Sequence, residues 1–117
     1  MEQKATVTYY TTVQGENPVK EFIDSLAKTQ KSKIFRVFQY MQEFGLQTPL
    51  PHVKKLIGTS LWEIRILGQD NIRVLYAAPQ KDTILLLHGF VKKKQKTPIR
   101  ELGTALNRFR DWISRNS

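Results

Sequence analysis

Two arginines, two lysines and a histidine in the second half of the chain are the residues best suited to act on a phosphodiester. Arg65 and Arg73 lie in short apolar runs, and Lys92 and Lys93 follow a third run that leads into His88. Metal-free cleavage of RNA needs a group that accepts the 2′-hydroxyl proton, positive charge on the phosphorane and a proton for the leaving oxygen. Arginine offers planar donors, lysine binds phosphate or exchanges protons, and histidine titrates near neutral pH. These five residues are the candidate catalytic set.

Aromatic and further basic side chains lie close to this set in sequence. Phe90 and Tyr76 could stack on a nucleobase. The candidate RNA-binding residues are Lys54, Lys55, Phe90, Lys94 and Lys96. A lysine-rich turn is normally a solvated or phosphate-steering surface, and that alternative stays open.

The arginines are expected to lie on a β-hairpin. Apolar and polar residues alternate over residues 61–67 and again over residues 72–76. This period of two is typical of a half-buried strand. The turn-forming residues Gly68, Gln69, Asp70 and Asn71 separate the two runs and complete the hairpin pattern.

Burial fixes the expected register of this hairpin. If the apolar residues of both strands share one face, Ile66 lies opposite Ile72 and Arg65 lies opposite Arg73, with the turn centred near Gln69. Two facing arginines repel by roughly several tenths of a kcal/mol, which an anionic ligand would relieve. The alternative is that Glu63 pairs with one arginine and the whole set is a solvated sheet surface.

The third run, Thr83–Leu87, is apolar without alternation, as expected of a strand that is covered on both faces. Gly89 follows it and could mark a bulge, which would change the alternation of the side chains beyond it. The sequence therefore leaves open which face His88, Phe90 and Lys92 share.

The other elements have clear boundary signals. The expected elements are a strand over Ala5–Val13, a helix from Pro18 capped by Asn17, a helix from Thr29 or Gln30 to Phe44, and a C-terminal helix from Pro98 capped by Thr97. Lys54 and Lys55 are assigned to the connection before the hairpin. The sum is an α+β fold of order β-α-α-β-β-β-α, an antiparallel sheet with an N-terminal helical hairpin and a C-terminal helix, over residues 1–117 as one domain.

The charge is strongly positive and unevenly placed. Residues 1–50 hold six basic and five acidic side chains, whereas residues 51–117 hold thirteen basic and five acidic ones, which together give the net charge of +9. Such a basic surface favours RNA or DNA as a partner, and an acidic protein next, because neutralising phosphates releases counterions. A basic surface that serves solubility alone is the remaining alternative.

Several other functions lack a motif. The chain has no cysteine, its two histidines are far apart, and its glycines do not form a phosphate loop, so neither a metal nor a nucleotide cofactor is expected. The first residues lack a signal-peptide core and no run approaches the ~20 apolar residues of a membrane span, so a cytoplasmic location without membrane association is expected.

Five strings together resemble a known family: LWEIR, IRVLY and HGFVKKKQKTP, preceded by NPVKEFIDSL and VKKLIG. They are similar to the HigB-like, phage-derived branch of the RelE/ParE toxin superfamily. This resemblance covers almost the whole chain, and the expected order of elements is similar to the fold of that superfamily.

The resemblance implies the toxin of a type II toxin-antitoxin system, a ribosome-dependent endoribonuclease that cuts translated mRNA. It also implies a helix-turn-helix antitoxin of the HigA type, through whose complex the toxin would reach operator DNA. The basic active-site residues of the family fall on Arg65, Arg73, Lys92 and Lys93, and His88 and Lys96 belong to the same signature. No tyrosine follows Tyr76, so the general acid stays open, with His88 as first candidate.

Two alternatives remain from the sequence. The superfamily also contains ParE-like toxins that inhibit gyrase and do not cleave RNA. A third hypothesis is a nucleic-acid-binding or regulatory module without toxicity.

Overall fold

The computed structural model describes residues 5–45, 53–66, 68, 71–93 and 97–116. In this part of the chain the strands form one mixed, five-stranded sheet of order β1-β5-β4-β3-β2. The strands are β1 Thr6–Tyr9, β2 Val53–Lys55, β3 Leu61–Arg65, β4 Ile72–Ala77 and β5 Thr83–Val91. The helices are α1 Pro18–Asp24, α2 Lys28–Phe44 and α3 Ile99–Arg115.

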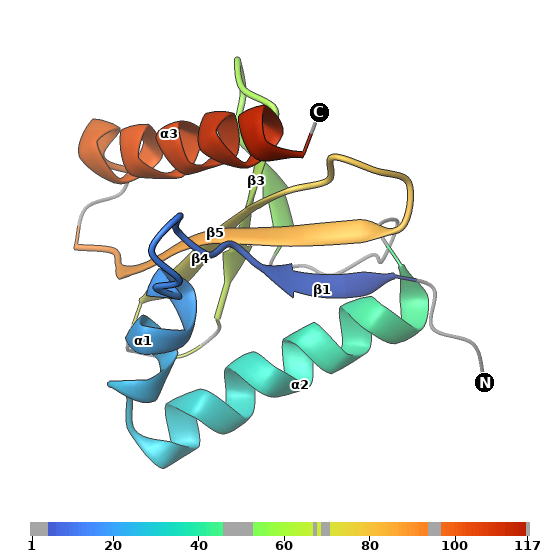
Figure 1. The fold of residues 1–117 in the computed structure, drawn as a ribbon. Coiled ribbons are helices and arrows are strands. Elements are labelled where there is room, and N and C mark those ends of the chain that lie inside the picture. The colour runs from blue at the N-terminus through green and yellow to red at the C-terminus, as the bar shows by residue number, and fades with distance from the viewer. Residues whose placement is uncertain (1–4, 46–52, 67, 69–70, 94–96, 117) are drawn as a thin grey trace.

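The helices cover opposite faces of the sheet. Figure 1 shows α1 and α2 on one side and α3 on the other, with β5 and β1 between them. Separate apolar clusters fill the two interfaces, one under α1 and α2 and one under α3. The sheet therefore divides the molecule, and every side chain of an inner strand belongs to either the α1/α2 face or the α3 face.

The α+β class and an inner strand that begins at Thr83 were predicted correctly. That strand, β5, continues to Val91, beyond the expected end at Leu87, and the sheet is not fully antiparallel. The edge strand β1 pairs with β5 in parallel. The other neighbouring pairs are antiparallel. The helices α1 and α2 and the strands β2, β3 and β4 lie between β1 and β5 in sequence, so no short turn joins these two strands. Their relative direction is therefore not determined by local turn chemistry.

Residues Val53–Lys55 form the edge strand β2 and not the expected connection. This strand pairs antiparallel with β3, with Lys54 opposite Glu63 and Lys55 opposite Trp62. A strand this short with two lysines carries little apolar alternation, which explains why its sequence pattern did not indicate it.

The start of α1 confirms its predicted cap, whereas the start of α3 does not. The Asn17 side chain accepts a hydrogen bond from the Lys20 backbone N–H at 3.2 Å. At the other helix Pro98 occupies the N-cap position, and the Thr97 hydroxyl instead donates to Glu63 at 2.5 Å. A buried carboxylate thus binds the hydroxyl that was expected to cap the helix.

The predicted hairpin register is confirmed. Arg65 pairs with Arg73 across β3 and β4, and the Ile66 N–H donates to the Ile72 carbonyl at 3.0 Å. The tip of the turn near Gln69 lies outside the described residues.

The irregularity in β5 lies before His88 and not at Gly89. Leu75 pairs with His88 and Tyr76 with Leu86, so Leu87 is the extra residue of a bulge. The bulge shifts the alternation by one position, and His88 therefore faces α3 together with Leu87. Gly89, where the bulge was expected, pairs regularly with Val74.

Candidate active site

The bulge in β5 brings the candidate residues together on the α3 face of the sheet. Arg65, Arg73 and Phe90 form one row across β3, β4 and β5. Lys54, Glu63, Leu75 and His88 form the neighbouring row, which begins on β2. Because directly paired residues of a sheet share a face, both rows point to the same side.

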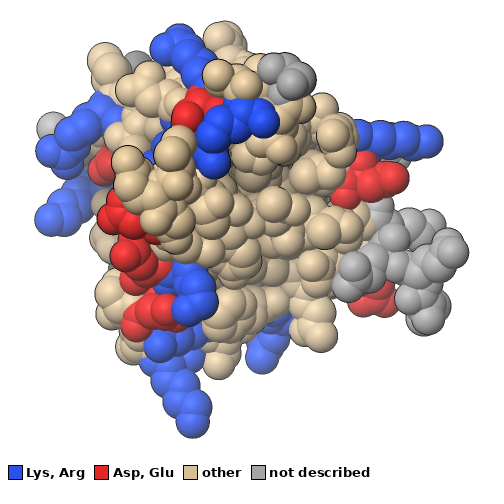
Figure 2. All heavy atoms as spheres, in the orientation of Figure 1, with Lys and Arg blue, Asp and Glu red and all other residues tan. Residues whose placement is uncertain are grey.

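Four basic side chains form what we term the cation cluster: Lys54, Arg65, Arg73 and Lys92. Arg73 is buried, whereas Arg65 and Lys54 are exposed and Lys92 is partly covered. Lys92 follows directly after β5, where its backbone N–H donates to the Asn71 carbonyl at 2.8 Å. Figure 2 shows Lys and Arg side chains standing out from the left edge of the molecule, where Figure 1 places the end of β5 and the start of α3.

Arg73 is the buried member of the cluster, with only 8% of its surface exposed. One terminal nitrogen donates to the Ile72 carbonyl at 3.0 Å, and Nε lies 3.6 Å from a carboxylate oxygen of Glu63. No described residue accepts a hydrogen bond from Nε. Burial lowers the pKa of Arg73, against the effect of Glu63, and Arg65 lowers it further. The guanidinium thus stays a charged group that is incompletely neutralised.

Glu63 is the anionic centre of the cluster and is 1% exposed. Its two oxygens have different partners, since Oε1 faces Arg73 and Oε2 accepts the hydrogen bond from Thr97. The alternative in which Glu63 pairs with an arginine is therefore half right. The pair exists, but it is buried and not solvated. Because Glu63 also binds Thr97, it links the sheet to the segment that enters α3.

The surroundings of Lys92 lower its pKa, which favours a role in proton transfer. Burial lowers its pKa, Glu63 acts against this shift, and the cations Arg73, Lys54 and Arg65 lower the pKa further. A lysine with a lowered pKa has a larger neutral fraction, which can accept a proton. Within the described part of the chain, the charged groups that act on Lys92 are thus three cations and one carboxylate.

His88 is fixed in a bonded network. Its Nε2 lies 2.8 Å from Oε1 of Glu101, and its Nδ1 lies 3.1 Å from a guanidinium nitrogen of Arg108. Because a guanidinium only donates, Nδ1 must accept and Nε2 must carry the proton, which describes a neutral ring. Burial lowers the pKa of His88, the Glu101 hydrogen bond opposes this, and Arg108 lowers it further.

The aromatic candidates are divided between the two faces. Phe90 lies on the α3 face and stacks on His88, with ring centroids 5.5 Å apart. Tyr76 is 2% exposed, stacks on Trp62 on the α1/α2 face, and burial raises its pKa to about 12. Stacking of Tyr76 on a base is therefore wrong for this fold.

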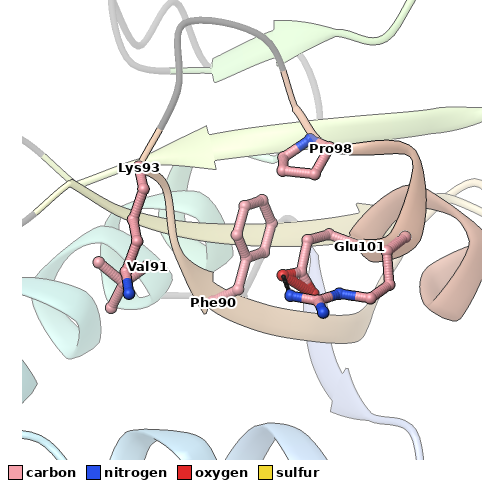
Figure 3. A pocket seen from close by; sticks show the side chains of 6 residues that line it. Phe90, Val91, Lys93, Pro98 and Glu101 are labelled. Carbon is pink, nitrogen blue, oxygen red and sulfur yellow. Dashed lines mark ion pairs between the residues drawn. The ribbon is translucent and has the colours of Figure 1, made fainter.

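The other candidate lysines do not all lie at the cation cluster. Lys55 lies over the Trp62 ring and donates to the Thr59 carbonyl at 2.7 Å, so it stands apart from Lys54 and the cluster. Lys93 is exposed and lies beside the cluster, on the far side of Phe90 from Glu101 in Figure 3. Lys94 and Lys96 lie outside the described residues.

A pocket of about 540 Å³ opens next to the cation cluster. We term it the Phe90 pocket, and its walls are Phe90, Val91, Lys93, Pro98, Arg100 and Glu101. It lies between the end of β5 and the first turn of α3, as Figure 3 shows. Phe90 pairs directly with Arg73, so one residue separates this pocket from the cluster.

Two charged residues of this site, Glu101 and Arg108, were not predicted from the sequence. Glu101 and Arg108 flank Ala105, the fully buried residue of α3, four positions before it and three after it. Both therefore lie on the stripe of α3 that meets the sheet. Charged residues on an otherwise apolar helical stripe were the signal, but their partner His88 could not be assigned to this face without the bulge.

The comparison with known families agrees with the sequence strings. The family model "Phage derived protein Gp49-like (DUF891)" matches residues 21–110. The chain therefore belongs to this phage-derived, Gp49-like family, which is RelE-like and toxin-like. No curated protein matches the chain.

Among the described residues, no three His, Asp or Glu side chains are grouped so that they could hold a metal ion. None of the described helices has the length and apolar character to cross a bilayer.

Proposed function

We propose that the chain is a HigB-like toxin of a type II toxin-antitoxin system, a metal-independent endoribonuclease that cleaves mRNA on the translating ribosome in the cytoplasm. The observation that carries the proposal is the cation cluster, in which, among the described residues, Lys54, Arg65, Arg73 and Lys92 gather around the carboxylate of Glu63. This excess of positive charge suits a phosphate that develops further negative charge in its transition state. Membership of a toxin-like family supports the same conclusion.

The proposed reaction assigns a role to four basic groups. The 2′-oxygen attacks phosphorus while Lys92, in its neutral form, accepts the 2′-hydroxyl proton. Arg65 stabilises the phosphorane through charge and hydrogen bonds, and the buried Arg73 stabilises it through its charge. The bond from phosphorus to the 5′-oxygen then breaks, and Lys93 donates a proton to that oxygen. The products are a 2′,3′-cyclic phosphate and a 5′-hydroxyl.

His88 is not the proton donor in this proposal. Both of its ring nitrogens are engaged, and the proton on Nε2 is held by Glu101 at 2.8 Å. Its use as an acid would break a buried hydrogen bond in every turnover. We propose instead that His88 supports the neighbouring groups.

The proposed partners follow from the family resemblance and the charge. A HigA-type helix-turn-helix antitoxin would neutralise the toxin, and operator DNA would be bound only through their complex. The ribosome would supply and hold the mRNA, with Lys54 on the exposed edge of the cluster steering the phosphate backbone.

Purified protein, incubated with labelled mRNA on programmed ribosomes, tests the proposal. Arg65→Gln is the informative variant because Arg65 is exposed and its loss should leave the fold intact. Arg36→Gln on α2 is the matched control, since it removes the same charge from an exposed site on the opposite face. We expect cleavage to yield cyclic phosphate ends and to fall about 100-fold or more in Arg65→Gln, with Arg36→Gln unchanged.

Three outcomes would contradict the proposal. Equal losses in Arg65→Gln and Arg36→Gln would mean that total charge, and not the cluster, determines the rate. Intact mRNA together with DNA breaks in toxin-producing cells would favour a ParE-like inhibitor of gyrase. Salt-dependent RNA binding without any effect on growth would favour a non-toxic binding module.

A further inference from the structure

The Phe90 pocket has the size and composition of a site for a small planar group. Its volume of about 540 Å³ falls within the usual range of small-molecule pockets, roughly 300–1,000 Å³. Val91 and Pro98 supply most of the accessible apolar surface, because Phe90 is only 5% exposed, while Lys93, Arg100 and Glu101 supply charge. In Figure 3 the Phe90 ring stands in the middle, with Lys93 and Val91 to one side and Pro98 and Glu101 to the other.

The carboxylate of this pocket is held in a fixed direction. Oε1 of Glu101 accepts the Nε2 proton of His88 at 2.8 Å, and Arg108 holds the other ring nitrogen of His88 at 3.1 Å. The Glu101 side chain is only 16% exposed. Its Oε2 has a weak partner, since the nearest Arg100 nitrogen is 3.9 Å away. The acceptor is therefore oriented before any ligand arrives, which lowers the entropic cost of binding.

The cations of the pocket are free to adapt to a ligand. The Arg100 side chain is 86% exposed, and Lys93 is also exposed. Either can donate to a ligand acceptor, and a guanidinium can also stack on a planar ring. The pocket thus combines a fixed acceptor with exposed donors and apolar surface.

Guanine matches this arrangement. Its Watson–Crick edge presents two adjacent donors, N1–H and N2–H, which suit a carboxylate, whereas adenine and cytosine each present one amino group there and uracil one ring N–H. Its O6 and N7 acceptors are the preferred targets of Arg and Lys. Because Phe90 pairs with Arg73, a base in this pocket lies next to the proposed phosphate site.

We propose that the Phe90 pocket binds a guanine base of the RNA and that Glu101 is the residue that selects it. The inference rests on the proposed function for its biological meaning, since it assigns a base preference to the same cleavage site. His88 is the positioning residue for this selection, because it holds the Glu101 carboxylate in place and stacks on Phe90.

Binding of 5′-mononucleotides to the isolated protein tests this inference without ribosomes or cleavage. Calorimetric titrations would compare GMP, AMP, CMP and UMP. We expect GMP to bind about tenfold tighter than the other three, and Glu101→Gln to remove this preference. Glutamine can still accept the His88 proton, so circular dichroism should report an intact fold. Glu43→Gln, an exposed carboxylate on α2, is the matched control and should keep the preference for GMP.

A second variant guards against a folding defect in Glu101→Gln. Arg100→Gln changes an exposed side chain and should weaken GMP several-fold without affecting stability. Equal affinity of the unmodified protein for the four nucleotides, or a GMP preference that survives Glu101→Gln, would overturn the inference.

The same data separate the two proposals. A protein that selects GMP but leaves mRNA intact would retain the pocket assignment and refute the endoribonuclease. A protein that cuts mRNA on ribosomes but binds all four nucleotides equally would retain the endoribonuclease and refute the pocket assignment.

Discussion

Lys92 is the residue on which the proposed chemistry depends most. Replacement by methionine should lower the cleavage rate roughly 100-fold or more, because the proton acceptor is lost. Replacement by arginine should be equally inactive, since arginine keeps the charge but does not release its proton at accessible pH. Single-turnover cleavage on ribosomes measures both, with Lys81→Met, an exposed lysine at the other end of the β4–β5 hairpin, as control.

The pH dependence of the cleavage rate is a second test of the role of Lys92. Burial and the neighbouring cations place the Lys92 pKa below 10.5. The rate should therefore rise with pH and level off below that value. Near-normal activity of Lys92→Arg would show that the residue acts only through its charge and would contradict its role as proton acceptor.

His88 should make the fold sensitive to mild acid. Its pKa is lowered in the folded state from the ordinary value of 6.5, and the groups that face it are Glu101 and Arg108. Below pH 6.5 the unfolded chain binds more protons than the folded one, so the free energy of unfolding must fall as pH falls through this region. The loss is at most about 1.4 kcal/mol for each pH unit between the two pKa values.

Urea unfolding at about pH 7.5 and about pH 5.5 measures this loss. His88→Gln can bond both neighbours without titrating, so its stability should depend less on pH over the same interval. An equal pH dependence in the two proteins would contradict the assignment of His88 as a buried neutral ring.

At the scale of elements, Gly89 determines how closely α1 can approach β5. It pairs with Val74 and faces α1, where an added Cβ would lie 2.4 Å from Cδ2 of Phe22. Gly89→Ala should therefore lower the free energy of unfolding by about 1–3 kcal/mol through overpacking. Phe22→Leu in the same chain should recover part of this loss because it removes the clashing ring. An unchanged urea midpoint in Gly89→Ala would contradict this explanation.

The register of β3 and β4 could be predicted from the sequence, but the face of β5 on which His88 lies could not. The facing arginines followed from alternation and burial alone, since a one-residue slip would have moved the apolar set of one strand to the opposite face of the sheet. The face of His88 did not follow, because a bulge at Leu87 has no distinct residue type. Gly89 looked like the marker of that bulge, but its small size is needed for Phe22 instead.

Long-range pairing accounts for the other differences. Thr97 carries an ordinary capping signal, and only contact with Glu63, far away in sequence, explains its different partner. Glu101 has the same explanation, since its role depends on His88 across the α3 interface. The basic candidates were visible as residue types, whereas the carboxylates that orient them became apparent only with the sheet and α3 in place.

At the scale of the whole molecule, charge and architecture coincide. The second half of the chain, with thirteen basic and five acidic residues, supplies β2 to β5 and α3, while the nearly balanced first half supplies β1, α1 and α2. The cation cluster therefore lies on the α3 side of the sheet, and the two N-terminal helices form a support on the other. This arrangement places most of the excess positive charge on β2 to β5 and α3, which suits a small protein that binds a large polyanion.

The most direct measurement of the central claim is tightly controlled expression in a bacterium, followed by mapping of mRNA 5′ ends across the transcriptome. The account predicts new 5′ ends inside translated reading frames with the unmodified protein, their absence with Arg65→Gln, and their persistence with Arg36→Gln. Growth arrest without such ends, or the same ends in Arg65→Gln, would contradict the claim that the cation cluster cleaves mRNA on the ribosome.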